Sequence, residues 1–317
     1  MNFQLSEPIL VIGIGGVGTK LAFKAKELLH SECLLISNDQ KDLESDFNSI
    51  KISTKSAINP SVQLIRGSAF EDSQKIENEI SKYSTIVILA NLAGKAGSAL
   101  APVVSSICKE NHKNVLSFAV MPFKFEKDRI FQSGISLKRL REYSGCTIVL
   151  DNDALLDSNP DLTPSTCHKI SNDAIWNVIS SLKTTSIPDD TNILSTGKDV
   201  SNVEESFKDS LRMLYEDAPP TSVKRSILYI LGGENVPVGV LNSVTNIASS
   251  VFNQEYTSVT PSIGASERSK VIMLSSVQGE THFDKYDPLG VISQEKTLDW
   301  EEPECSINCE FDLYQLE

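Results

Sequence analysis

Two stretches rich in glycine and other small residues have the composition of anion-binding loops. The first, Gly13–Gly18, lies between an apolar run and an amphipathic stretch. The second, Ala93–Ala99, follows the apolar run Ile86–Ala90 and precedes Ala101 and Pro102, and a proline fits the first turn of a helix. A strand, a small-residue loop and a helix start together present unpaired N–H groups and the positive end of a helix dipole to an anion such as phosphate. For the second stretch, a tight connection that binds nothing is the alternative, because small residues also permit close packing.

Apolar runs alternate with amphipathic stretches through the first half of the chain. The predicted strands are Pro8–Ile12, Leu34–Ile36, Val62–Ile65, Ile86–Ala90, Val115–Val120 and Thr147–Leu150. The predicted helices run from the first loop to about His30, over Asp72–Lys82, from about Ala101 to His112, and over Ser136–Tyr143. This alternation predicts an α/β fold with a doubly wound, Rossmann-like parallel sheet, whose ligand binds at the carboxyl ends of the strands.

The second half changes character and indicates further units. Helices are predicted from Pro164 to Leu182, over Val203–Glu216 and over Val238–Phe252, and strands over Ser226–Leu231, Tyr256–Thr260 and Lys270–Ser276. We therefore divide the chain into a nucleotide-binding domain at 1–163, a central and a connecting helix at 164–221, a smaller α+β domain at 222–284 and an acidic tail at 285–317. From Glu295 onward, eight acids and one lysine surround Trp300, Phe311 and Tyr314. This composition is typical of a solvated tail, with a partner-docking peptide as the alternative.

Composition limits the classes of partner and site. The 29 basic and 42 acidic residues give a net charge of −13, which disfavours nucleic acids and anionic membrane surfaces. No apolar run approaches the ~20 residues of a membrane helix, and the N-terminus lacks the basic residues of a signal peptide. We expect a cytoplasmic protein without direct membrane insertion. The six cysteines and four histidines are scattered, so no metal site made by side chains and no disulfide framework is predicted.

The first loop by itself fits more than one class of phosphate binder. Gly13, Gly15 and Gly18 match the dinucleotide fingerprint, and Asp39 lies where a ribose-binding acid is expected, which favours a nicotinamide or flavin enzyme. The variant with Gly16 is also similar to the start of adenylating enzymes. Both interpretations leave the second loop, Ala93–Ala99, without a function.

The chain as a whole resembles the FtsZ/tubulin superfamily, and FtsZ more than tubulin. That family's first glycine-rich loop is matched by Gly13–Gly18, and its signature GGGTGTG falls on Ala93–Ala99, where Gly94, Gly97 and Ser98 keep the pattern. Its KPFNFE segment is similar to Met121–Glu126. The resemblance extends from about Ile9 to Val277 and implies a GTP-binding domain, a central helix and a smaller α+β domain.

The resemblance also implies a site for GTP or GDP. Glu126 and Arg129 would hold ribose and phosphate, guanine would lie between His168 and Asn152, and Asp173 would accept hydrogen bonds from the base. The complete set of candidate nucleotide-binding residues is Gly13, Gly15, Gly16, Gly18, Asp39, Gly94, Lys95, Gly97, Ser98, Glu126, Arg129, Asn152, His168 and Asp173.

The chain departs from the family where the chemistry is expected. The third phosphate loop falls on Gly67–Glu71, where a phenyl ring and a carboxylate replace small residues. Lys20 and Lys95 stand at phosphate loops, and they either replace the charge neutralisation of Mg²⁺ or are exposed substitutions in a weak site. This leaves open whether Mg²⁺ takes part.

The family's acidic loop, Asn-x-Asp-x-x-Asp after the central helix, has no counterpart in this chain. Asp189 and Asp190 have the wrong spacing and are interpreted as a turn after Pro188. No catalytic residue is assigned.

These features predict an FtsZ-like cytoskeletal or cell-division-associated protein that binds guanine nucleotide, with GTP hydrolysis reduced or lost. It would assemble head to tail with itself or with a conventional FtsZ, and its acidic tail would contact an accessory protein. Two alternatives stay open: an active GTPase with unorthodox catalytic residues, and an adenylating or NAD-dependent Rossmann enzyme.

Overall fold

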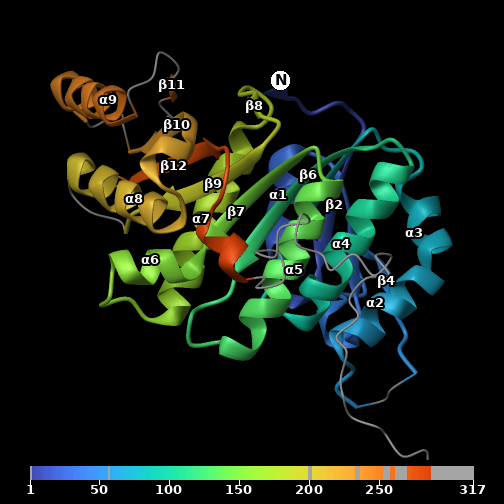
Figure 1. Cartoon of the computed structure of the whole chain (residues 1–317). Coiled ribbons are helices and arrows are strands. Elements are labelled where there is room, and N and C mark those ends of the chain that lie inside the picture. The colour runs from blue at the N-terminus through green and yellow to red at the C-terminus, as the bar shows by residue number, and fades with distance from the viewer. Residues whose placement is uncertain are drawn as a thin grey trace, which may run out of the picture.

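The fold is built on a ten-stranded sheet with helices on both faces (Figure 1). The computed structural model describes residues 2–55, 58–198, 202–232, 236–252, 258–260 and 270–286. The strands are β1 (Asn2–Phe3), β2 (Ile9–Ile14), β3 (Glu32–Ser37), β4 (Asn48–Lys51), β5 (Thr85–Asn91), β6 (Asn114–Met121), β7 (Cys146–Asp151), β8 (Ile187–Pro188), β9 (Thr191–Thr196), β10 (Val223–Leu231), β11 (Ser258–Thr260) and β12 (Lys270–Val277). The helices are α1 (Gly15–Leu29), α2 (Val62–Glu71), α3 (Ser73–Ile80), α4 (Lys95–Glu110), α5 (Lys127–Tyr143), α6 (Asn152–Ser158), α7 (Pro164–Ser181), α8 (Val203–Asp217) and α9 (Val238–Phe252), with short 3₁₀ helices at Gln40–Asp42, Pro220–Ser222 and His282–Tyr286.

The strand order places the carboxyl ends of the central strands at one edge of the sheet. The order is β11-β10-β12-β9-β7-β6-β5-β2-β3-β4, and β1 pairs separately with β8. Every pairing from β4 to β9 is parallel, whereas β12 runs antiparallel to both β9 and β10. The predicted α/β fold with a parallel sheet is therefore confirmed.

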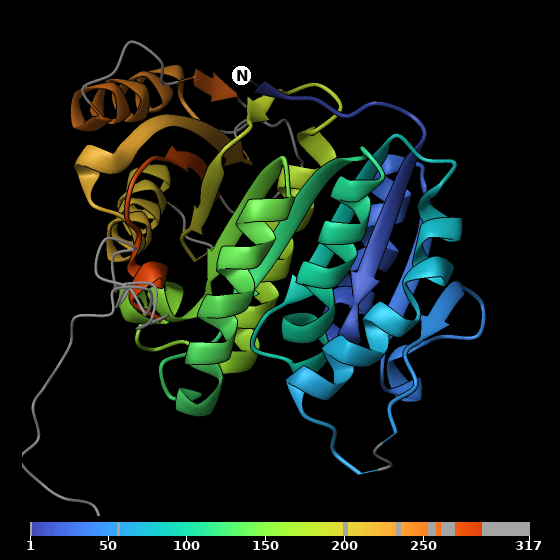
Figure 2. The same cartoon turned by 45° about the vertical axis from the view of Figure 1, so that its right-hand side comes forward.

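The central strands are buried on both faces, as their unbroken apolar runs predict. In β2, Leu10, Ile12 and Ile14 pack into one core cluster with α2, α3, α4 and α5, whereas Ile9 and Val11 pack into another with α1 and α7. Figure 2 shows α4 and α5 lying in front of the sheet. Helices on both faces leave the carboxyl ends of the strands as the open edge.

The predicted strand Val62–Ile65 is wrong, because these residues begin helix α2. The Ser61 hydroxyl caps the helix by accepting a hydrogen bond from the Leu64 N–H at 3.2 Å. Ile65, Ser68 and Ala69 are buried, which is the i, i+3, i+4 spacing of a helix face. The edge strand that pairs with β3 is β4 instead.

Helix α4 begins at Lys95, so the predicted start near Ala101 is also wrong. Pro102 lies inside the helix, where it cannot donate to the carbonyl of Ser98. The Ser136 hydroxyl on α5 donates to that carbonyl at 2.8 Å. A neighbouring helix thus satisfies the acceptor that the proline leaves free. Helix α5 likewise begins earlier than predicted, at Lys127 rather than Ser136.

Strand β9 was not predicted, and it joins the two halves of the sheet. It pairs with β7 from the first half and with β12 from the last part. The segments 1–163, 164–221 and 222–284 therefore share one sheet, and their division into domains stays a prediction. The acidic tail beyond Tyr286, with Cys305 and Cys309, lies outside the described residues. Among the described helices, none is both long and apolar enough to span a bilayer.

Candidate functional site

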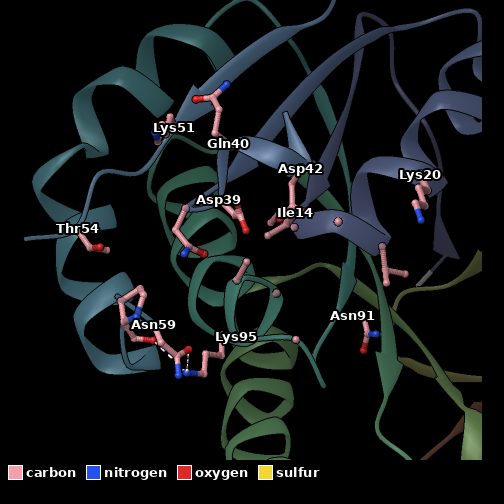
Figure 3. A pocket seen from close by; sticks show the side chains of 18 residues that line it. Ile14, Lys20, Asp39, Gln40, Asp42, Lys51, Thr54, Asn59, Asn91 and Lys95 are labelled. Carbon is pink, nitrogen blue, oxygen red and sulfur yellow. Dashed lines mark hydrogen bonds between the residues drawn. The ribbon is translucent and has the colours of Figure 1, made fainter. Parts of the chain in front are cut away.

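A cavity of about 730 Å³ opens at the carboxyl ends of β2, β3, β4 and β5 (Figure 3). Its walls are supplied by segments 14–20, 38–42 and 91–97, together with Lys51, Thr54, Asn59 and Pro60. Because these strands are parallel, the loops that follow them meet at one edge of the sheet. Both glycine-rich stretches therefore contribute to the same cavity, as the sequence predicted.

The four glycines of the first loop serve two different purposes. Gly15, with φ of +65°, and Gly16 line the cavity. A Cβ at Gly18 would lie 2.2 Å from the Leu89 carbonyl oxygen, and a Cβ at Gly13 would lie 2.8 Å from the Cβ of Ala22. Gly13 and Gly18 thus allow α1 to pack closely on the sheet, while Gly15 and Gly16 leave its first turn accessible.

Helix α4 presents its first turn to the same cavity. Gly94 is the N-cap without a side-chain cap, and Lys95, Ala96 and Gly97 line the cavity. A Cβ at Gly97 would lie 2.0 Å from the Asn91 carbonyl oxygen, so only glycine fits at this close approach. The start of α1, at Ile14, also lacks a side-chain cap. The first N–H groups of both helices have no partner within their own helix and are available to an anion.

Charged side chains of both signs surround these helix starts. Lys20, Lys51 and Lys95 line the cavity together with Asp39 and Asp42. The Ser37 hydroxyl donates to Asp42 Oδ2 at 2.7 Å, and a Cβ at Gly16 would lie 2.7 Å from Asp42 Oδ1. The Asp42 carboxylate is therefore held beside the first turn of α1.

Ser98 and Arg129 line a neighbouring cavity of about 520 Å³ between α2, α4 and α5. The Ser98 hydroxyl lies 2.8 Å from the Ser136 hydroxyl, and Arg129 Nη1 forms a 2.7 Å ion pair with Glu126 Oε1. Asn59, Gly94 and Lys95 line both cavities. Glu126 itself lines neither of them.

The three residues expected to read the base lie away from both cavity walls. The Asn152 side chain is buried, accepts a hydrogen bond from Ser171 Oγ at 2.7 Å and lies 3.5 Å from His168 Nδ1. Burial lowers the pKa of His168, which favours the neutral ring. The structure thus brings Asn152 and His168 together, while Asp173 lies further along α7 and lines neither cavity.

The predicted third phosphate loop, Gly67–Glu71, is wrong, because these residues belong to α2 and line neither cavity. The loop that reaches the cavity is the one before α2, with Thr54, Asn59 and Pro60. Asn-Pro followed by Ser is a turn and helix-start signal that could have indicated this position. Asp42, Lys51 and Asn91 were also missed.

Asp189 and Asp190 lie at the opposite edge of the sheet from the cavity. Strand β9 pairs with β7 in parallel, with Thr191 beside Thr147, so the turn before β9 is at the amino ends of the strands. The carbonyl oxygen of Asp190 accepts hydrogen bonds from the Thr147 N–H at 3.3 Å and from Asn192 Nδ2 at 3.0 Å. Among the described residues, no group of three His, Cys, Asp or Glu side chains is arranged to hold a metal ion.

Comparisons of sequence show which proteins the chain is similar to. Residues 8–160 match the model of the Tubulin/FtsZ family, GTPase domain. Cell division protein FtsZ 2 of Methanocaldococcus jannaschii is 25% identical over 194 residues, which cover 58% of this chain and 51% of that protein. FtsZ 2 of Halobacterium salinarum is 23% identical over 272 residues, 75% of this chain and 68% of that protein. The match thus spans about half the length of the Methanocaldococcus jannaschii relative.

Solved structures share the fold at low sequence identity. An empty FtsZ dimer from M. jannaschii has a TM-score of 0.67 at 17% identity, covering 86% of this chain and 88% of that chain. CetZ2 from Haloferax volcanii, in a protofilament with GTPγS bound, has a TM-score of 0.66 at 14% identity, covering 90% of this chain and 99% of that chain. Residues 8–160 thus match the GTPase domain of the Tubulin/FtsZ family, and the chain is similar to archaeal FtsZ in sequence and shares the fold of the solved FtsZ and CetZ structures.

Proposed function

We propose that the protein is a cytoskeletal or cell-division-associated FtsZ-like protein that binds GTP or GDP with its phosphates in the 730 Å³ cavity and its base outside this cavity, toward Asn152, His168 and Asp173. The observation that carries the proposal is the convergence of two helix starts, α1 at Gly15 and α4 at Lys95, without a capping side chain at either. Two sets of unpaired N–H groups suit a chain of phosphates. GTPγS bound to the structural relative CetZ2 supports a guanine nucleotide.

Asp173→Ala is expected to weaken GTP binding about tenfold or more and to remove the preference for GTP over ATP. In the proposal, the Asp173 carboxylate accepts hydrogen bonds from guanine that adenine does not offer, and Asn152 and His168 hold the other side of the base. Isothermal titration calorimetry with GTP, ATP and NAD measures this. Asp161→Ala removes an exposed carboxylate before α7 and should leave the preference unchanged.

Equal binding of ATP and GTP by the unaltered protein would contradict the base assignment, as would a guanine preference that survives Asp173→Ala. Binding of NAD or ATP alone would favour the dinucleotide or adenylating alternative. Binding of no nucleotide at millimolar concentration would refute the proposed function.

GTP hydrolysis is proposed to be reduced or lost. Helix α7 ends at Ser181 and β8 begins at Ile187, so the connection between them is short. It has neither the length nor the residues of the acidic loop expected of the family. Orienting a water with a carboxylate is a large part of what such an enzyme contributes. We expect phosphate release far below ~1 s⁻¹, the low end of typical turnover, in a phosphate-release assay with excess GTP.

Sustained turnover at an ordinary enzymatic rate would favour the active-GTPase alternative. In that case, loss of turnover in the double variant Asp189→Asn with Asp190→Asn would identify these residues as the source of the catalytic acid. Both lie at the end of the sheet opposite the cavity, so in a head-to-tail assembly they would face the cavity of the next subunit.

Assembly is proposed to be head to tail. The carboxyl ends of the strands of one subunit, where the cavity lies, would contact the amino ends of the strands of the next subunit. Such heterologous contacts propagate as filaments. A net charge of −13 makes copies repel each other, most at low ionic strength. We expect little pelleting of the pure protein with GTP at low salt, and more at high salt or with a conventional FtsZ as partner. Abundant GTP-dependent filaments of the pure protein at micromolar concentration and low salt would contradict this.

The acidic tail from Glu295, with Trp300 and Phe311, is proposed as the contact for an accessory protein. Its apolar side chains are embedded among acids, a composition that suits a docking peptide.

A further inference from the structure

Three lysines from three different elements line the cavity at the helix starts. Lys20 lies on α1, Lys51 ends β4 and Lys95 is the first residue of α4. Figure 3 shows them on different sides of the cavity, with Asp39 and Asp42 between them. Elements that are far apart in the sequence thus bring three ammonium groups to one space.

Asp39 and Asp42, the two acids that line the cavity, accept hydrogen bonds from residues at the end of β3 and in the segment that follows it. Asp42 Oδ2 accepts a hydrogen bond from the Ser37 hydroxyl at 2.7 Å, and Asp39 Oδ1 accepts one from the Lys41 N–H at 3.0 Å. Neither acid forms an ion pair with a lysine of the cavity within the part of the chain that the structure describes. Among the described residues, no carboxylate in direct contact therefore neutralises the charges of these lysines.

Lys95 is held in place by neutral acceptors. Its Nζ donates to Asn59 Oδ1 at 2.6 Å and lies 3.4 Å from the Pro60 carbonyl oxygen. This contact joins the loop before α2 to the first turn of α4, and it keeps the positive charge beside the N–H groups of that turn. Amide and carbonyl oxygens orient an ammonium group without cancelling its charge.

We propose that Lys20, Lys51 and Lys95 neutralise the phosphate chain of the bound nucleotide, so that the cavity binds this chain without a divalent cation. The proposal rests on the proposed nucleotide binding and adds to it the source of the positive charge. A lysine binds phosphate as a point charge, and the starts of α1 and α4 add partial positive charge on the same chain of oxygens. Lys51 contributes from an edge strand, where sequence patterns indicated no phosphate loop.

The experiment compares nucleotide binding with and without a divalent cation. GTP and inorganic tripolyphosphate are titrated calorimetrically into the full chain, once with Mg²⁺ and once with EDTA, at the same ionic strength. The expected dissociation constants differ by less than about threefold between the two buffers, whereas Lys51→Gln weakens both ligands about tenfold. Lys41→Gln is the matched control, since Lys41 lies in the 3₁₀ helix between β3 and β4 and does not line the cavity, and this variant should bind as the unaltered protein does.

The outcomes separate the two proposals. Tight GTP binding that falls by tenfold or more in EDTA would overturn the lysine proposal and leave nucleotide binding intact. Equal losses in Lys51→Gln and Lys41→Gln would overturn it too, since they would indicate a general charge effect. Failure of GTP to bind in either buffer would refute the nucleotide site itself. Thermal unfolding of each variant establishes that it is folded, and Lys20→Gln provides a second test on a different element.

Discussion

Gly97→Ala is expected to lower the free energy of unfolding by about 3 kcal/mol or more, which is large for the addition of one methyl group. A Cβ at this position would lie 2.0 Å from the carbonyl oxygen and 2.8 Å from the carbonyl carbon of Asn91. Both are backbone atoms at the end of β5, so no side chain can move to relieve the clash. The first turn of α4 must then shift away from the sheet. Urea denaturation followed by circular dichroism measures the effect.

Two other glycines provide matched controls. A Cβ at Gly67, inside α2, would meet no atom within 4 Å, so Gly67→Ala should raise the free energy of unfolding by roughly 0.5–1 kcal/mol through helix propensity. Gly94→Ala would place its Cβ 3.4 Å from the Asn91 carbonyl oxygen and should have a small effect. If Gly97→Ala were as mild as Gly94→Ala, the close approach of α4 to β5 would be refuted.

The position of the first loop was predictable because its signal is local. A strand, four glycines and an amphipathic helix follow one another in Pro8–His30, and the structure places them in that order as β2 and α1. Their separate functions were not predictable. Gly15 lines the cavity, whereas Gly18 lets α1 approach β5. The function of Gly18 depends on its contact with Leu89 from another strand, which the local sequence does not show.

The start of α4 and the identity of α2 were harder to predict for a related reason. Small residues such as Ala96 and Gly97 have no strong local preference that marks a helix start, and Pro102 indicated a first turn that lies elsewhere. The short apolar run Val62–Ile65 fits a strand and a helix equally well by periodicity. The Ser61 cap decides for the helix. Lys51 reaches the cavity because β4 pairs with β3, and Asn59 contacts Lys95 of α4; both are non-local interactions.

A buried pair of acids, Asp151 and Asp217, also escaped prediction because its members come from distant elements. Asp151 ends β7 and caps α6, and Asp217 is the last residue of α8. Only 2% of the Asp151 surface and 1% of the Asp217 surface is exposed, neither Asp217 carboxyl oxygen has a donor among the described residues, and the nearby Asp151 carboxylate raises the pKa of Asp217. Because two neighbouring buried carboxyl groups are strongly disfavoured when both are ionised, we expect the pair to hold one proton.

The surrounding backbone indicates which acid holds the proton. Asp151 Oδ1 accepts a hydrogen bond from the Asp153 N–H at 2.9 Å at the start of α6, which favours the ionised form. Asp217 lies at the negative end of α8, which favours the neutral form. Burial raises the pKa of Asp151 to about 7 and that of Asp217 well above its ordinary value, to which the Asp151 charge contributes.

The groups packed around the pair do not remove its need for a proton. Lys124 Nζ forms a 2.8 Å ion pair with Asp153 Oδ2, so its charge is shared with a third carboxylate. Burial, together with the nearby carboxylates, raises the pKa of the Tyr286 hydroxyl, which stays neutral. The Glu216 carboxylate also raises the pKa of Asp217.

Asp217→Asn is therefore expected to stabilise the protein at pH 8, by ~1–3 kcal/mol, and to have a smaller effect at pH 5. Because the folded pKa values are raised, the folded protein binds a proton that the unfolded chain releases near pH 4, so this contribution to stability decreases as the pH rises from about 4 through about 7. An asparagine donates to Asp151 at every pH and has no proton to lose. Urea denaturation at pH 5, 6, 7 and 8 measures the difference in free energy of unfolding between variant and unaltered protein, and Asp161→Asn, at an exposed site, should show no such trend. A difference that stays constant from pH 5 to pH 8, or an Asp217→Asn protein that is less stable at pH 8, would refute the shared proton.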